Sequence, residues 1–203
     1  MNEQTNLAGK IVIGLTGNIA TGKSTVMRLA AEQGALTIDA DQVVHKVLND
    51  DTAVQEAVAE TFGAQVRRAD GRIDRAALGA IVFNDAQSLV QLEQIVHPRV
   101  SLRIMILIQE SAAGVVMIEA IKLLEGKLWM LCQEIWVTTC SYERQLQRLQ
   151  VCRGMEKAAA EARIKAQGPA EEKTDRADVV IDTDGLMRDT EHQFANAWSR
   201  LVE

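Results

Sequence analysis

One eight-residue segment near the start of the chain limits the fold more than any other feature of the sequence. It reads Gly17-Asn18-Ile19-Ala20-Thr21-Gly22-Lys23-Ser24, a full match to the pattern G-x-x-x-x-G-K-[S/T]. An apolar run, Ile11–Thr16, precedes it, and a segment with helical spacing follows it through Met27, Leu29 and Ala30. In this strand–loop–helix order the pattern predicts a phosphate-binding loop, with the helix beginning near Thr21.

The fixed residues of this loop suit the binding of a nucleoside triphosphate. Glycine has no Cβ, so Gly17 and Gly22 let backbone N–H groups curl around a phosphate. Lys23 places a compact positive charge against the β- and γ-phosphate oxygens, and Ser24 offers a hydroxyl to Mg²⁺. The positive end of the following helix dipole points at the same anion. We therefore expect residues 17–25, Thr25 included, to bind ATP together with Mg²⁺.

Four further short apolar runs, together with Ile11–Thr16, predict a parallel sheet. Most are rich in β-branched residues and do not alternate with polar ones, as expected for strands that are covered on both faces; they span residues 35–38, 115–119, 135–138 and 179–181. Helical spacing lies between them, and a last amphipathic helix spans residues 186–201. The alternation predicts an α/β fold of the P-loop NTPase type, a doubly wound sheet of about five parallel strands with helices on both faces.

The stretch between the second and third predicted strands is too long for one crossover, so we expect an inserted helical subdomain at residues 47–114. It contains helical patterns at 53–62, 75–83 and 88–96, and Pro98 marks the start of another helix. A charged stretch at residues 147–170, after the fourth strand, predicts a helical lid, the alternative being a merely solvated helix pair. Residues 9–46, 115–146 and 171–203 then form the nucleotide-binding core.

Two carboxylates follow the second predicted strand, at the edge where doubly wound sheets bind their ligands. Asp39 and Asp41 are two residues apart, so on an extended backbone they share a face. There they can hold Mg²⁺ through water and accept a proton from an attacking hydroxyl. The alternative is that one of them caps the helix predicted at residues 42–48.

Phosphoryl transfer also requires cations over the charge that develops on the phosphate. The predicted lid and the inserted subdomain both supply arginines: Arg144, Arg148, Arg153 and Arg163 in and beside the lid, and Arg75 and Arg103 in the subdomain. Together with the phosphate loop and the carboxylate pair, they predict a kinase that acts on a small molecule.

Composition argues against several other classes of function. The chain has 203 residues and a formal net charge of −6, which does not favour binding to a nucleic-acid backbone or an anionic membrane. Only 3% of its residues are aromatic, too few to favour a surface on which bases stack. Its three cysteines fit neither a zinc pair nor a disulfide framework, and the first ten residues contain no apolar signal-peptide core. We expect a cytoplasmic monomer or small homo-oligomer with reduced thiols and no nucleic-acid or membrane partner.

In their order and spacing these motifs resemble those of the dephospho-coenzyme A (dephospho-CoA) kinase family. The resemblance covers about residues 11–184 and includes the phosphate loop, the Ile38-Asp39-Ala40-Asp41 segment and several later blocks: Gly71-Arg72-Ile73-Asp74-Arg75, Leu78, His97-Pro98, Ala162-Arg163-Ile164-Lys165-Ala166-Gln167, Glu171-Glu172-Lys173 and Ala177-Asp178-Val179-Val180-Ile181-Asp182 with Gly185. It implies transfer of the γ-phosphate of ATP to the ribose 3′-hydroxyl of dephospho-CoA, the last step of coenzyme A synthesis.

The resemblance also implies roles for individual residues. Asp41 would be the base on the 3′-hydroxyl, and Ser24 and Asp39 would contact Mg²⁺. Lys23 would act with lid arginines on the transferring phosphate. The acceptor would be bound by residues from several segments: Asp39, Asp41, Arg75, His97, Glu125 and Gln167. For His97 a role at the helix entry or in packing is the alternative.

Two stretches differ from the family pattern. Where the family reads Asp-x-Pro-Leu-Leu-aromatic-Glu, residues 119–125 read Glu-Ala-Ile-Lys-Leu-Leu-Glu, which keeps both acids but places Lys122 at the rim of the expected acceptor site. In the lid, Arg153 stands one residue after the usual second arginine, a rotation of about 100° on a helix. We therefore expect Arg148 and Arg163 to be the catalytic lid arginines.

Two other functions stay open on the residues alone. Another P-loop kinase for small metabolites or nucleosides would share the loop and lid but use different acceptor contacts. A nucleotide-dependent switch protein would need no acceptor, and Asp182-Thr183-Asp184-Gly185 resembles the D-x-x-G of GTPases. No Asn-Lys-x-Asp follows it, so we interpret this segment as a turn near the adenine.

Overall fold

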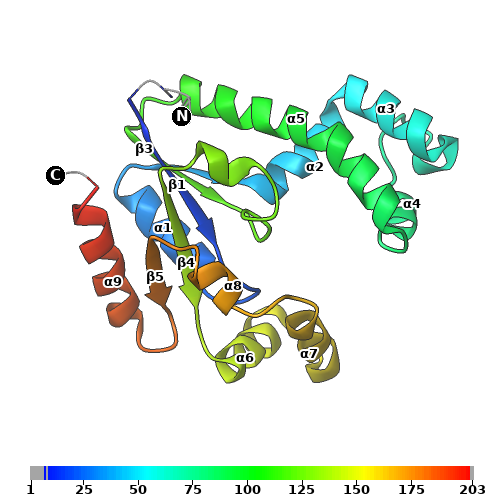
Figure 1. The fold of residues 1–203 in the computed structure, drawn as a ribbon. Helices are drawn as coiled ribbons and strands as arrows, with labels where there is room; N and C mark the ends of the chain where they lie inside the picture. The colour runs from blue at the N-terminus through cyan, green and yellow to red at the C-terminus, as the bar shows by residue number, and fades with distance from the viewer. Residues whose placement is uncertain (1–6, 8, 202–203) are drawn as a thin grey trace. The chain divides into compact units, whose positions relative to one another are not determined.

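The computed structural model describes residue 7 and residues 9–201. The chain divides into two compact units, one containing residues up to Ile38 and from Ser111 onward, the other containing Asp39–Glu110. The first unit is built around a β-sheet, and the second consists of helices joined by short loops (Figure 1).

The sheet has five strands in the order β2-β3-β1-β4-β5. The central strand β1 (Ile11–Thr16) pairs in parallel with β3 (Val115–Glu119) and β4 (Glu134–Thr139), and β4 pairs in parallel with β5 (Val179–Asp182). Strand β2 (Leu36–Asp39) forms the other edge. The predicted α/β class is confirmed, and every strand begins and ends within one residue of its predicted bounds.

Two helices cover one face of this sheet. Ile13 and Leu15 of β1 pack in a buried cluster with side chains of α1 (Lys23–Glu32) and α9 (Met187–Ser199). Within the cluster Trp136 meets Phe194 edge-on at a centroid distance of 5.8 Å, and Phe194 stacks on Trp198 at 5.3 Å. Leu201, predicted to close the apolar stripe of the last helix, lies just beyond α9 and packs against the same cluster.

The opposite face of β1 is covered at Gly14. A Cβ built at this glycine would lie 2.6 Å from the side chain of Leu123 and 2.9 Å from Cys132 Sγ. Both contacts come from the segment between β3 and β4, which includes the short 3-10 helix η2 (Leu128–Leu131). Burial raises the pKa of the Cys132 thiol to about 12, and all three cysteines are free thiols, as predicted. Because β1 is buried on both faces, its run of apolar residues without alternation is explained.

The helical unit contains α2 (Ala40–Asp50), α3 (Thr52–Phe62), η1 (Ala64–Val66), α4 (Arg75–Val82) and α5 (Ala86–Glu110). Four aspartates begin helices by accepting hydrogen bonds from backbone N–H groups of the first turn: Asp39 for α2, Asp51 for α3, Asp74 for α4 and Asp85 for α5. Helix starts in this unit are therefore set by local side-chain capping.

The prediction that Pro98 starts a new helix is wrong. Helix α5 runs without a break from Ala86 to Glu110 and contains Pro98 in its interior. Its buried side chains recur every four residues on both sides of the proline, at Val96, Val100, Ile104 and Ile108. Packing of this continuous stripe outweighs the loss of one backbone hydrogen bond at the proline.

The segment predicted as a lid contains most of α6 (Tyr142–Arg153) and all of α7 (Lys157–Lys165), and the short helix α8 (Glu171–Thr174) follows it. Helix α6 starts before the predicted boundary, because the Ser141 hydroxyl accepts a hydrogen bond from the Arg144 N–H and caps it. It ends at Gly154, where φ is 61° and the chain turns back toward α7.

No helix within residues 7 and 9–201 combines the length and apolar character that a membrane crossing requires.

We predict that Phe194→Ala lowers the free energy of unfolding by about 3–5 kcal/mol, because it empties a site enclosed by two buried tryptophans. Urea unfolding followed by tryptophan fluorescence measures this change. Val180→Ala, at a half-exposed side chain of the edge strand β5, serves as the control and should shift stability much less. Equal effects of the two substitutions would show that the aromatic cluster does not stabilise the fold as described.

Candidate active site

The phosphate loop connects the end of β1 with the start of α1, and its backbone is curled. Gly17 has φ of 146°, Ala20 of 60° and Gly22 of 89°. Positive φ values such as these favour glycine, and Ala20 is the only non-glycine residue with positive φ among the described residues. The two glycines that the motif fixes therefore occupy backbone conformations that require them.

Close packing under the loop requires glycine as well. A Cβ on Gly17 would lie 2.5 Å from the Thr138 carbonyl oxygen and 2.8 Å from Thr21 Oγ1. The Thr21 and Thr138 hydroxyls hydrogen-bond at 2.7 Å, and Thr21 Oγ1 also donates to the Asn18 carbonyl at 2.8 Å. The loop thus rests directly on the end of β4.

Lys23 lies beneath the loop with only 7% of its surface exposed. Its Nζ donates to the carbonyls of Gly17 at 2.9 Å and Asn18 at 3.1 Å, and it lies 4.0 Å from the Glu119 carboxylate at the end of β3. The parallel register of β1 and β3, which aligns Leu15 with Glu119, brings that carboxylate to the same edge of the sheet. Ser24, by contrast, is exposed at the first turn of α1.

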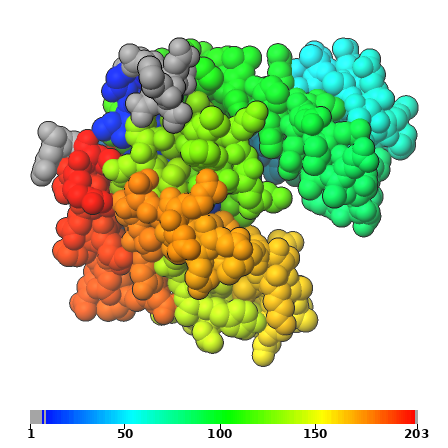
Figure 2. All heavy atoms as spheres, viewed as in Figure 1, coloured from blue at the N-terminus to red at the C-terminus, as the bar shows by residue number. Residues whose placement is uncertain are grey.

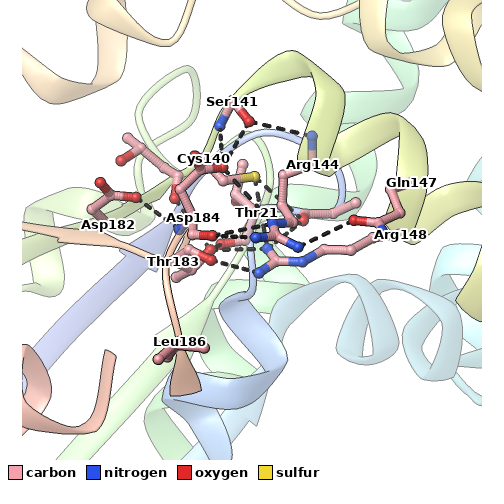
Figure 3. A network of polar contacts seen from close by, with 12 residues as sticks. Thr21, Cys140, Ser141, Arg144, Gln147, Arg148, Asp182, Thr183, Asp184 and Leu186 are labelled. Carbon is pink, nitrogen blue, oxygen red and sulfur yellow. Dashed lines mark hydrogen bonds and ion pairs between the residues drawn. The ribbon is translucent and has the colours of Figure 1, made fainter. Parts of the chain in front are cut away.

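A second group of polar contacts joins the loop to α6 and to the turn after β5 (Figure 3). Arg148 donates through Nη1 to the Ala20 carbonyl at 3.0 Å and to Thr183 Oγ1 at 2.9 Å, and through Nη2 to the Thr183 carbonyl at 2.6 Å. Thr183 Oγ1 in turn donates to the Thr21 carbonyl at 2.9 Å. Arg148, expected to meet the transferring phosphate, thus lies with its guanidinium against the backbone of the loop. Arg148 Nη1 also lies 3.7 Å from Cys140 Sγ, and burial raises the pKa of this thiol above its ordinary value.

The turn after β5 is also tied to the start of α6. Both the N–H and the hydroxyl of Ser141 donate to Asp184 Oδ1, at 3.0 and 2.7 Å, and Arg144 donates to the Asp184 carbonyl through two nitrogens. The Ser141 hydroxyl, followed by its N–H, holds the pKa of Asp184 below its ordinary value. This turn is therefore ordered by side chains from α6 (Figure 3).

Gln167, expected at the acceptor, contacts the phosphate loop. Its Oε1 accepts a hydrogen bond from the Ile19 N–H at 2.6 Å. The neighbouring Asn18 side chain donates to the Gly168 carbonyl at 3.0 Å and accepts from Lys173 Nζ at 2.8 Å. The segment after α7 is thus attached to the second and third residues of the loop.

The helical unit carries the carboxylate pair and Arg75. Asp39 accepts hydrogen bonds from both the N–H and the side-chain amide of Gln42, at 3.0 and 2.9 Å, so it is the carboxylate that caps α2. Asp41 is exposed in the first turn of the same helix. One turn further on, His45 Nε2 lies 2.7 Å from Arg75 Nη2.

The remaining predicted residues lie at the surface. His97 is exposed on α5. Glu125 is exposed between β3 and β4, 3.6 Å from Lys122. Arg163 is exposed in the last turn of α7, a helix that lies at the surface of the first unit (Figure 2).

Sequence reasoning missed several residues that hold the loop, and their signals were weak. Glu119 was noted only as an acid retained from the family pattern, although its place at a strand end put it at the ligand-binding edge. Thr138, Thr183 and Gln145 lie in segments whose contacts with the loop span more than a hundred residues of chain. No local spacing rule connects positions so far apart.

We predict that Ser141→Ala raises the pKa of Asp184 toward its ordinary value, because it removes the largest cause of the lowered pKa. A lowered carboxyl pKa contributes stability at pH values above the ordinary pKa, and this contribution disappears as the pH falls through the lowered value. The variant should lose about 1 kcal/mol of stability for the missing helix cap. The additional difference in stability that comes from Asp184 should disappear in acid. An NMR titration of the Asp184 carboxyl carbon checks the shift, with Ser199→Ala as the control. An unchanged titration midpoint would contradict the assignment.

Comparison with known proteins identifies the family. The family model described as dephospho-CoA kinase matches residues 11–189. A dephospho-CoA kinase of Carboxydothermus hydrogenoformans is 42% identical over 186 residues, covering 90% of each chain. Among solved structures, TT1252 from Thermus thermophilus superposes with a TM-score of 0.81 at 30% identity over 95% of this chain and 98% of its own. The dephospho-CoA kinase from Campylobacter jejuni superposes with a TM-score of 0.60 at 26% identity over 94% and 97%. The chain belongs to the dephospho-CoA kinase family.

Proposed function

We propose that this protein transfers the γ-phosphate of ATP to the ribose 3′-hydroxyl of dephospho-CoA, giving coenzyme A and ADP as the last step of coenzyme A synthesis. The observation that carries the proposal is the curled phosphate loop, formed from the motif residues in a chain of this family. The acidic net charge and the free cysteines fit a cytoplasmic monomer or small homo-oligomer that acts without a nucleic-acid or membrane partner.

The loop fits a nucleoside triphosphate. Its positive-φ residues curl the backbone between β1 and α1, and a curled backbone of this kind is typical of anion-binding loops. Helix α1 begins directly after Gly22 with no side-chain cap, and the positive end of its dipole favours an anion at this turn. Lys23 lies at the same turn, where its ammonium supplies positive charge for the β- and γ-phosphates. We assign residues 17–25 to ATP.

Mg²⁺ is assigned to the exposed hydroxyl of Ser24, with Asp39 acting through water. Both Asp39 carboxylate oxygens accept hydrogen bonds from Gln42. This arrangement suits a water-mediated contact with Mg²⁺ better than direct coordination of the ion. When bound, the ion neutralises charge on the β- and γ-phosphate oxygens.

Asp41 is the general base of the proposed reaction. Its carboxylate takes the proton of the 3′-hydroxyl as that oxygen forms a bond to the γ-phosphorus. The bond between the γ-phosphorus and the bridging oxygen breaks, and ADP leaves with that oxygen. Lys23 and Arg163 supply positive charge for the transferring phosphoryl group, and Arg148 supports the loop that holds it.

We assign the acceptor to the helical residues 47–114, with Gln167 and Glu125 as further acceptor residues. Arg75 carries the positive charge that the diphosphate of dephospho-CoA requires, and its contact with His45 fixes the direction of the guanidinium. His97 is the second acceptor residue of this unit. Residues 147–170 act as the lid over ATP.

We predict that Asp41→Asn lowers turnover by about 10²-fold or more, while the affinity for ATP stays within a few-fold of wild type, because only the proton acceptor is lost. Steady-state kinetics and ATP binding are measured on the same preparations. Glu191→Gln, which removes an exposed carboxylate charge on α9, is the control and should keep wild-type turnover. Turnover of Asp41→Asn equal to that of the control would remove Asp41 from the role of base.

The identity of the acceptor is tested by measuring the release of ADP from ATP in parallel assays, each with one of four compounds as acceptor: dephospho-CoA, AMP, shikimate or gluconate. We expect turnover with dephospho-CoA to exceed that with each other compound by at least about 10³-fold, because discrimination of this size follows when a site is built to bind groups that the others lack. Efficient turnover of another acceptor without turnover of dephospho-CoA would refute the proposed function.

A further inference from the structure

Ile19 occupies a position that the phosphate-loop motif leaves free, yet its side chain is 8% exposed. It does not join the core of the sheet. It forms a separate apolar cluster with Leu149 of α6 and Ala160 of α7, both fully buried, and further side chains pack against this cluster: Ala20, Leu146, Met155 and Ile164. We call residues 142–165, which contain α6 and α7, the helical hairpin. The apolar centre of the hairpin is therefore completed by a residue of the phosphate loop.

The backbone of Ile19 is bound from the same direction. Its carbonyl accepts a hydrogen bond from Gln145 Nε2 of α6 at 3.0 Å, and its N–H donates to Gln167 Oε1, just after α7, at 2.6 Å. Gln145 is itself only 7% exposed, so its amide is committed to this contact. The side chain, N–H and carbonyl of one loop residue are thus all held by the hairpin and the segment that follows it.

The residues on either side of Ile19 are held in the same way. Asn18 is fixed by the Gly168 carbonyl and by Lys173, as described above. Ala20 has a φ of 60°, which costs an L-residue conformational energy, and its carbonyl accepts from Arg148 of α6. A charge-assisted hydrogen bond to that carbonyl offsets part of the cost of the left-handed conformation.

We infer that the helical hairpin is a positioning element for the phosphate loop, and that it acts through Ile19. The inference rests on the proposed function only in taking an adenine nucleotide as the ligand of the loop. A flap that simply swings over bound ATP needs few contacts with the loop beneath it. Here the hairpin and the loop share an apolar cluster, and hydrogen bonds hold three consecutive loop residues. The loop must therefore move whenever the hairpin moves. The N–H groups that receive the phosphates therefore keep their arrangement only while the hairpin is docked.

The test is a substitution inside the hairpin that touches no ligand. Leu149→Ala removes a fully buried side chain of the cluster, and it should weaken the binding of ADP with Mg²⁺ by roughly tenfold, because loosening the hairpin loosens the loop. Leu78→Ala is the matched control, since it makes the same truncation at a buried position in the helical unit and should leave the ADP affinity unchanged. Calorimetry on the full chain gives both affinities, and thermal unfolding shows that each variant is folded.

A double-mutant cycle separates coupling from a general loss of stability. Ile19→Ala and Leu149→Ala remove two sides of one contact, so their effects on ADP affinity should not add, whereas Ile19→Ala with Leu78→Ala should be additive. If Leu149→Ala does not fold, Ile19→Val and Gln167→Ala replace it, with smaller losses of affinity expected. By reciprocity, ADP should slow amide hydrogen exchange in α6 and α7 of the wild type.

ADP affinity of Leu149→Ala equal to that of Leu78→Ala, or additive effects in the cycle, would overturn the inference. These readouts use binding alone. A protein that binds ADP but does not phosphorylate dephospho-CoA would refute the proposed function while leaving this inference intact.

Discussion

The close approach of the phosphate loop to the end of β4 is the constraint on which the rest of the site depends. Gly17 passes so near Thr138 that no side chain fits between them, and the loop can curl only because its glycines adopt positive φ. The parallel register of the sheet creates this contact, since it brings the carboxyl ends of β1, β3 and β4 to one edge. Glu119 and Thr138 reach the loop from the neighbouring strands for the same reason.

The surroundings of the loop turn a phosphate-binding motif into an ordered nucleotide site. Arg148 links the Ala20 carbonyl with Thr183, and Ser141 and Arg144 hold Asp184 in the same turn. Helix α6 therefore fixes both the loop and the turn after β5, so that the arrangement of one depends on the arrangement of the other. The sensitivity of the loop to the hairpin that we infer is a direct consequence of this shared support.

Much of the fold could be predicted because the signals are local. Buried parallel strands are short apolar runs, and the motif at Gly17 fixes what lies before and after it. A proline is a strong local signal for a helix start, and for this reason Pro98 predicts one. The four-residue repeat of buried side chains around it nevertheless continues α5 through the proline. The repeat is visible in the sequence, but only its burial in the folded unit shows that packing outweighs the proline signal.

Some residues of the candidate site can likewise be predicted from local sequence, and others cannot. Motif residues such as Lys23 and Ser24 follow from sequence, because their chemistry and spacing are fixed together. The hydrogen bond from the Ile19 N–H to Gln167 cannot be predicted from sequence, because the two residues are separated by 148 positions and glutamine suits many roles. Of the two carboxylates, Asp39 is the one that caps α2, an alternative that the sequence had left open.

The central claim is that the phosphate bound by this loop is passed to the ribose of dephospho-CoA. The most direct measurement is ³¹P NMR of the products formed from ATP, Mg²⁺ and dephospho-CoA. We predict a new phosphomonoester signal coupled to the proton at the ribose 3′ carbon, growing in step with ADP. Release of inorganic phosphate alone, or a phosphomonoester on any other carbon, would contradict the account.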